Sequence, residues 1–152
     1  MDLDKIDKQI LRFLQIDSQI TVKDISMRVG LSTTPVFERI KRLEKNGYIK
    51  KYVAIVDREK VDRGLTVFST VVLRDHTKAA FKKFEVEIGK WDEVIECFKI
   101  AGLADYVLKI VVNNMKEYNE FISVKIGGLE IVGRSVSYFV MNEVKNTTAI
   151  PV

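Results

Sequence analysis

The apolar positions at the start of the chain repeat with the three- and four-residue spacing of helices. A first helix is predicted from about Asp4 to Gln15. Two shorter helices follow between Thr21 and Gly47, and Gly30 separates them because a turn with positive φ is least costly for glycine. The residues on the three apolar faces are Ile6, Ile10, Phe13, Leu14, Val22, Ile25, Val29, Val36, Ile40 and Leu43.

The two short helices have the layout of a helix-turn-helix. Ser32 precedes the second helix, where its hydroxyl is predicted to cap an orphan backbone N–H. Gly47 is predicted to end that helix as a C′ residue. Ser26 is small where the two helices must cross closely. In this layout the second helix enters the major groove of DNA.

After Gly47 the apolar spacing changes from helical to alternating. Ile49, Val53 and Ile55 alternate with other residues, which predicts a two-stranded ribbon and therefore a winged helix. The highly charged residues 57–65 are interpreted as a hinge that ends near Gly64.

The second half of the chain alternates between strand and helix patterns. Strands are predicted at 66–74, 93–101, 105–112 and 134–144, with helices that begin after Thr77 and Asn114. The order β-α-β-β-α-β predicts the ferredoxin-like arrangement, so the fold class is α+β. Helices cover only one face of such a sheet. The other face would expose Phe68, Tyr138 and Val140, which predicts at least a dimer.

The positive charge of the chain is confined to its first part. Residues 1–64 contain 14 basic and 10 acidic residues, whereas residues 65–152 contain 11 of each. Between 39 and 51 there are six basic residues and one acidic residue, Glu44. A basic stripe on one element is typical of nucleic-acid binding, although a solvated helix face is the alternative.

The composition excludes several other classes. One cysteine, Cys97, forms no internal disulfide, which fits a reducing cytoplasm. With His76 as the only histidine, an exposed turn residue in this interpretation, neither a metal site nor a histidine-based catalytic triad is expected. No apolar segment approaches the ~20 residues of a membrane span, and the charged N-terminus lacks a signal-peptide core.

Four segments together resemble the Lrp/AsnC, or feast/famine, family of transcription regulators. They are LDKIDKQIL (3–11), VGLSTTPVFERIKRLEKNGYIKKY (29–52), AGLADYVLKIVV (101–112) and VKNTTAIP (144–151). The resemblance implies a winged helix-turn-helix at 1–56, a hinge at 57–65 and a ferredoxin-like regulatory domain at 66–152. It also implies dimers that assemble into octamers or other even-numbered rings, with an amino acid or related effector bound between dimers, and no enzymatic activity.

Helix geometry divides the candidate DNA contacts into two groups. Residues opposite the buried stripe of the second short helix are expected to approach base edges: Thr33, Thr34, Phe37 and Glu38. Basic residues are expected to meet phosphates: Arg39, Lys41, Arg42, Lys50 and Lys51. Phe37 packs against the wing in the alternative interpretation. Ser32 caps the helix or touches phosphate.

The resemblance implies an effector site near the turn between the second and third strands of the regulatory domain. The residues concerned are Ala101, Gly102, Leu103, Asp105 and Tyr106, with Ser135 and Ser137 from the last strand. Asp105 is expected to pair with an α-amino group, or alternatively to cap the turn and orient Tyr106. Many family members have a polar or acidic residue after the glycine. Leu103 stands there instead, which favours an apolar ligand, an unusual one, or none.

The sequence is also compatible with two other functions. One is an architectural DNA-compacting protein that binds with little sequence preference and no effector, since basic contacts dominate both cases. The other is a sirohaem-decarboxylase-like enzyme, which needs histidine and basic residues around a tetrapyrrole. The single histidine and the lack of paired catalytic carboxylates argue against that enzyme.

Overall fold

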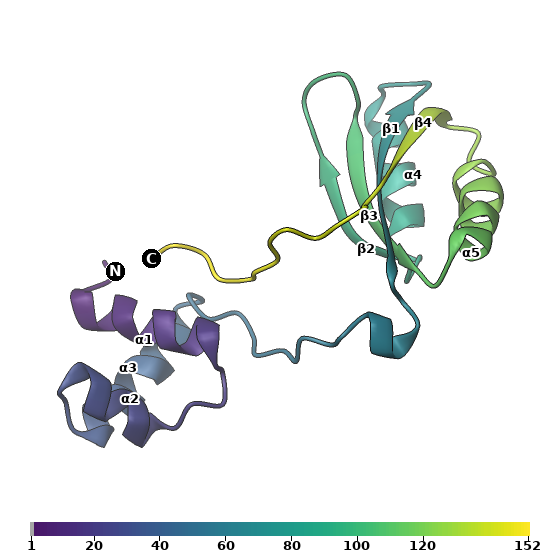
Figure 1. The fold of residues 1–152 in the computed structure, drawn as a ribbon. Coiled ribbons are helices and arrows are strands. Elements are labelled where there is room, and N and C mark those ends of the chain that lie inside the picture. The colour runs from purple at the N-terminus through teal and green to yellow at the C-terminus, as the bar shows by residue number, and fades with distance from the viewer. Residues whose placement is uncertain (1) are drawn as a thin grey trace. The chain divides into compact units, whose positions relative to one another are not determined.

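The computed structural model describes residues 2–152, and the chain forms two compact units (Figure 1). The first unit contains the residues up to Ile55 together with Val144–Val152. The second unit is Val56–Glu143. None of the helices in the described part of the chain is long and apolar enough to cross a membrane.

Three helices build the first unit: α1 (Lys5–Ile16), α2 (Val22–Val29) and α3 (Thr33–Lys45). This confirms the helices predicted from the apolar spacing. Asp4 and Asp7 begin α1 with a reciprocal capping box, in which each side chain accepts the other residue's backbone N–H. The three apolar faces form one core from Ile10, Leu11, Ile25, Val36, Ile40 and Leu43.

The turn between α2 and α3 forms where the sequence predicts it. Gly30 has φ 71°, and Gly47 after α3 has φ 75°, both in the left-handed region that favours glycine. Ser26 is buried and its hydroxyl donates to the Lys23 carbonyl oxygen at 2.7 Å. The predicted cap at Ser32 is wrong in one respect, because this residue occupies the N-cap position but its side chain accepts no hydrogen bond from the helix.

The two-stranded ribbon predicted after Gly47 does not form. Ile49 lies in a bend, and residues 50–56 belong to neither a helix nor a strand. An isolated two-stranded ribbon is marginally stable, and the alternating pattern predicts extended backbone without supplying a partner strand. A short 3₁₀ turn, Glu59–Val61, lies within the predicted hinge.

The second unit is a four-stranded antiparallel sheet with helices α4 (Lys78–Ile88) and α5 (Met115–Glu120) on one side (Figure 1). A π-helical turn, Phe121–Ile126, continues α5. Thr77 and Asn114 cap the two helices as predicted. The sheet order β2-β3-β1-β4 confirms the ferredoxin-like prediction. The strands are β1 (Leu65–Leu73), β2 (Val94–Lys99), β3 (Tyr106–Val112) and β4 (Val132–Phe139).

The two faces of the sheet differ in burial. Side chains on the helix-covered face of the sheet, including Val67 and Val71, form a core with Phe84 of α4. On the opposite face Phe68 is 38% exposed and Tyr138 is 56% exposed, which confirms the predicted open face. Strand β4 ends at Phe139, so the prediction of a strand over 134–144 is wrong at both ends. Residues 140–143, which follow β4, belong to neither a helix nor a strand.

Candidate nucleic-acid interface and ligand-binding unit

Helix α3 presents an exposed face along its length. Val36, Ile40 and Leu43 are buried against the rest of the first unit, which fixes the orientation of the helix. The opposite face therefore points to solvent. Its exposed residues are Ser32, Thr33, Thr34, Phe37, Glu38, Lys41 and Lys45.

Phe37 lies within this exposed face. Its side chain is 51% exposed, and the Lys41 ammonium stands 5.7 Å from the centre of its ring. Lys41 also forms an ion pair with Glu44 at 2.9 Å. Glu44 accepts a second bond from the Tyr52 hydroxyl at 3.0 Å, which joins α3 to the extended segment after it. The hydrogen bond from Lys41 lowers the pKa of Glu44.

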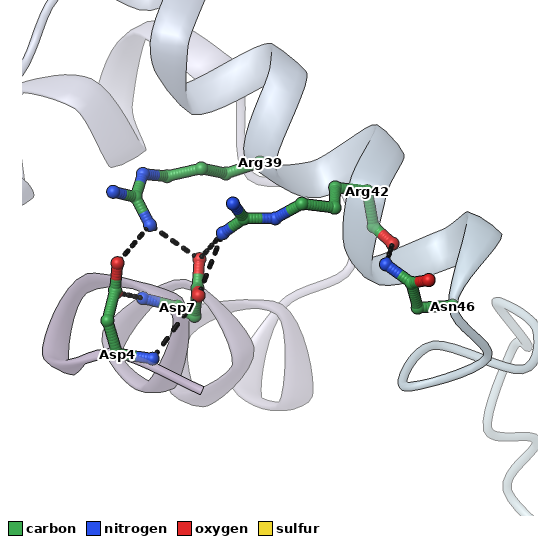
Figure 2. A network of polar contacts seen from close by, with 5 residues as sticks. All are labelled: Asp4, Asp7, Arg39, Arg42 and Asn46. Carbon is green, nitrogen blue, oxygen red and sulfur yellow. Dashed lines mark hydrogen bonds and ion pairs between the residues drawn. The ribbon is translucent and has the colours of Figure 1, made fainter. Parts of the chain in front are cut away.

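Arg39 and Arg42 form ion pairs with the start of α1 (Figure 2). Arg39 donates to Asp4 at 2.6 Å and to Asp7 at 2.7 Å. Arg42 donates to both oxygens of Asp7 at 2.8 and 2.9 Å. The side chain of Asp7 is 1% exposed, so its charge is held almost entirely inside the protein. We call these four residues the Asp7 network.

The Asp7 network holds α3 against α1. Bonds from the Asp7 backbone N–H and then from Arg39 lower the pKa of Asp4, and bonds to Asp4 and Asp7 raise the pKa of Arg39. Sequence reasoning missed the partners of Arg39 and Arg42. The available signal was that Asp7 falls on the apolar stripe of α1, three residues before Ile10, where an acid must find a partner.

The end of α3 is closed by Asn46, whose side chain donates to the Arg42 carbonyl oxygen at 2.9 Å (Figure 2). Beyond it, Lys50 and Lys51 are exposed on the extended segment. The first unit therefore offers cations at two places, on α3 and immediately after it.

The predicted effector turn lies between β2 and β3. Ala101, Gly102 and Leu103 are exposed, and Leu103 is 95% exposed. Gly102 has φ 145°, and a Cβ atom placed there would meet no other atom within 4 Å. The backbone conformation, rather than a lack of space, therefore favours glycine at this position.

Asp105 holds the turn against the neighbouring strand. Its Oδ2 accepts the Leu73 backbone N–H at 2.8 Å and lies 3.1 Å from Nε2 of His76. Its own N–H donates to the Val71 carbonyl oxygen at 2.9 Å. These contacts match the alternative in which Asp105 orders the turn. Both side-chain contacts involve Oδ2 of Asp105. His76 is 60% exposed, as expected for a turn residue.

The remaining candidate effector residues are not gathered at the turn. Tyr106 is 1% exposed, and its hydroxyl donates to Glu85 of α4 at 2.8 Å. Burial, and then this contact with Glu85, raises the pKa of Tyr106. Ser137 is hydrogen-bonded to the Tyr118 hydroxyl of α5. Ser135 lies opposite Val71 on β1, which in turn lies opposite Tyr106, so two strand spacings of about 5 Å separate Ser135 from Tyr106.

Both units match known families. A family profile described as winged helix-turn-helix DNA-binding matches residues 3–50, and one described as the Lrp/AsnC ligand binding domain matches residues 66–150. The leucine-responsive regulatory proteins of Escherichia coli and Salmonella typhimurium are each 37% identical over 149 residues. That alignment covers 98% of this chain and 91% of each relative.

Solved structures with the same architecture include two bacterial regulators. A transcriptional regulator from Neisseria meningitidis, solved as a complex with L-Met, has a TM-score of 0.95 and 35% identity, covering 99% of this chain and 97% of that one. An AsnC family transcriptional regulator from Agrobacterium tumefaciens has a TM-score of 0.93 and 36% identity, covering 98% and 97%.

Proposed function

The chain belongs to the Lrp/AsnC family of DNA-binding transcriptional regulators, and from that premise we propose that an apolar amino acid modulates its binding to DNA. The family is one of regulators, not enzymes. The single observation that carries the proposal is the joining, in one chain, of a helix-turn-helix with an exposed α3 face and a matched ligand-binding domain.

We propose that α3 reads DNA through its exposed N-terminal half. Thr33, Thr34, Phe37 and Glu38 are the candidates for base edges, because threonine methyl groups and Phe37 suit thymine methyls and Glu38 suits the cytosine N4 donor. Lys41, Lys50 and Lys51 are the candidates for phosphates, since all three are exposed. Ser32 joins them, with a hydroxyl that makes no bond to the helix.

Arg39 and Arg42 stand apart from the other candidates. Their guanidinium groups already bind Asp4 and Asp7, so a phosphate would have to share them or displace a carboxylate. Arg42 is 43% exposed and Arg39 is 24% exposed, and Arg42 is therefore the better placed of the two to contact a backbone phosphate as well.

The effector is proposed to be an amino acid with an apolar side chain. Leu103 is 95% exposed beside Gly102, where an apolar ligand would gain by covering it. The related Neisseria meningitidis regulator was solved with L-Met, which supports the same ligand class. Asp105 is the candidate for the α-amino group, although it already binds the Leu73 N–H and His76.

A second copy of the chain is proposed to cover the open face of the sheet. Phe68 and Tyr138 on this face are partly exposed, and burying them between subunits is favourable. Dimers that assemble further into an octamer or another even-numbered ring are the expected form. The protein is expected to act in the cytoplasm, where its DNA target lies.

The proposal is tested by titrating the protein onto DNA from its own promoter region and onto unrelated DNA of equal length. Promoter binding about 1,000-fold or more tighter than binding to unrelated DNA is expected. Methionine or leucine should shift the promoter affinity, whereas aspartate serves as the polar control. Equal affinity for both DNAs, with no response to any amino acid, would instead identify an architectural protein.

A further inference from the structure

The last residues of the chain pack on α1, which begins the first unit. Gln15 binds the backbone of Ile150 at two points: its Oε1 accepts the N–H at 2.7 Å, and its Nε2 donates to the carbonyl oxygen at 3.1 Å. Arg12 donates twice to the backbone oxygen of Val152, at 3.1 and 2.5 Å. Because Arg12 and Gln15 are three positions apart on a helix, they share one face. That face holds an extended peptide by its backbone.

Apolar contacts add to these hydrogen bonds. Val152 packs against the core of the first unit. Together with Ile150 it lines a groove of about 1010 Å³, whose other walls are α1 and the extended segment Tyr48–Ile55. The groove is therefore bounded by both segments that connect the first unit to the second, one before residue 56 and one after residue 143.

The residues that join these two segments to the second unit are also in contact with each other. Arg58, just after the first segment, donates to Glu143 at 2.5 Å, and Glu143 directly precedes Val144. The same guanidinium donates to the hydroxyl of Thr66 near the start of β1. The N–H of Val140 donates to the Thr66 carbonyl oxygen at 3.1 Å, close to the end of β4. The two segments that connect the units therefore leave the second unit next to the Arg58–Glu143 ion pair.

We propose that residues 144–152, which we call the strap, couple the ligand-binding unit to the DNA-binding helix. The strap directly follows Glu143, which is bound to Arg58 within the second unit, and its last residues are bound to Arg12 and Gln15 of α1. Helix α1 in turn holds α3 through the Asp7 network. Along the chain, the end of β4 is thus linked to α3 through Glu143, the strap, α1 and the Asp7 network. The DNA readout of this inference rests on the proposed function, whereas the anchoring of the strap does not.

The experiment compares the full-length double variant R12A/Q15A with K8A. Lys8 is exposed on α1, so K8A also removes one positive charge from that helix but leaves the strap contacts in place. Hydrogen–deuterium exchange is measured without DNA or amino acid. We expect exchange at the amides of Ala149, Ile150 and Val152 and in the C-terminal half of α1 to rise about 10-fold in R12A/Q15A only, since two hydrogen-bonding side chains are lost. Unchanged exchange in the strap would overturn its anchoring.

The coupling is measured separately, on the DNA that the wild type binds. In R12A/Q15A the shift in DNA affinity caused by methionine or leucine should be lost, while the amino acid still raises the melting temperature of the protein. An unchanged shift would overturn the coupling. A third variant, Ile150→Pro, removes the N–H that Gln15 accepts without altering α1 and should behave like R12A/Q15A. If the wild type binds no DNA, the exchange result still decides the anchoring.

Discussion

At the scale of single residues, Asp7 has the most consequences. It caps α1, and it also accepts hydrogen bonds from both arginines of α3 while its side chain is 1% exposed. A buried carboxylate is retained only where such partners are present. Two of the six cations between 39 and 51 are therefore held by this one buried carboxylate, which the sequence pattern alone does not reveal.

Replacing Asp7 by Asn should destabilise the first unit strongly. The change removes the charged partner that Arg39 and Arg42 share; because both arginines are partly exposed and Arg39 keeps Asp4, the expected loss is about 1.5–3 kcal/mol. Urea unfolding followed by circular dichroism measures the loss. Asp2→Asn, at an exposed position just before α1, is the control and should change stability by less than about 0.5 kcal/mol. Equal losses in the two variants would refute the role given to Asp7.

Asp4 should make stability depend on pH at the acidic end. Its pKa in the folded protein lies below its ordinary value of 3.8. Between the two values the unfolded chain binds more protons, so stability rises with pH there. The contribution is complete above about pH 4 and is lost as the pH falls through the lowered pKa. Asp4→Asn should therefore flatten the acid limb of an unfolding-stability curve measured from pH 2 to 6, and an unaltered limb would contradict this.

At the scale of the element, the helix-turn-helix is defined by the turn before α3. Gly30 has φ 71°, and a Cβ atom placed there meets nothing within 4 Å. Gly30→Ala should thus cost only the backbone strain, about 1 kcal/mol. Gly64→Ala is the matched control, because Gly64 lacks a left-handed φ and its added Cβ would stand an ordinary 3.8 Å from Glu59. Thermal unfolding of both variants makes the comparison, and a loss at Gly64 as large as that at Gly30 would argue against the strain.

The exposed face of α3 makes a second prediction at this scale. Lys41→Ala should weaken binding to every DNA sequence by a similar factor and reduce the slope of log affinity against log salt by about 0.9, if Lys41 neutralises one phosphate. Lys82→Ala on α4 serves as the control, since Lys82 is an exposed helical lysine of the second unit. Filter binding or fluorescence anisotropy at four salt concentrations gives the slopes. An unchanged slope would remove Lys41 from the phosphate contacts.

The elements were more predictable from sequence than the sites. Apolar spacing and capping residues located α1, α2, α3, α4 and the four strands, because these signals are local. The unpaired segment after Gly47 and the early end of β4 depend on which partner the backbone finds, which is not a local property. The effector residues show the same limit, since the patterns mark Asp105 and Tyr106 as neighbours while the fold buries Tyr106 beneath α4.

At the scale of the whole molecule, the open face of the sheet decides assembly. Tyr138 is 56% exposed beside Phe68, its partner on β1. Tyr138→Asp should place a charge in a subunit interface and lower the mass measured by light scattering, because unpaired charges are costly to bury. Val86→Asp, at a position of α4 that is 47% exposed, is the control. A mass that stays the same in Tyr138→Asp but falls in Val86→Asp would move the interface to the helical side.

The packing of the strap on α1 also has a consequence for the timing of folding in the cell. Gln15 and Ile150 are separated by 135 positions, and at about 5–20 residues per second a ribosome needs roughly 7–27 s to make the residues between them. The second unit is synthesised completely during this interval. Until then α1 lacks its hydrogen bonds to Ile150 and Val152, and the unit that was begun first is the last to be finished.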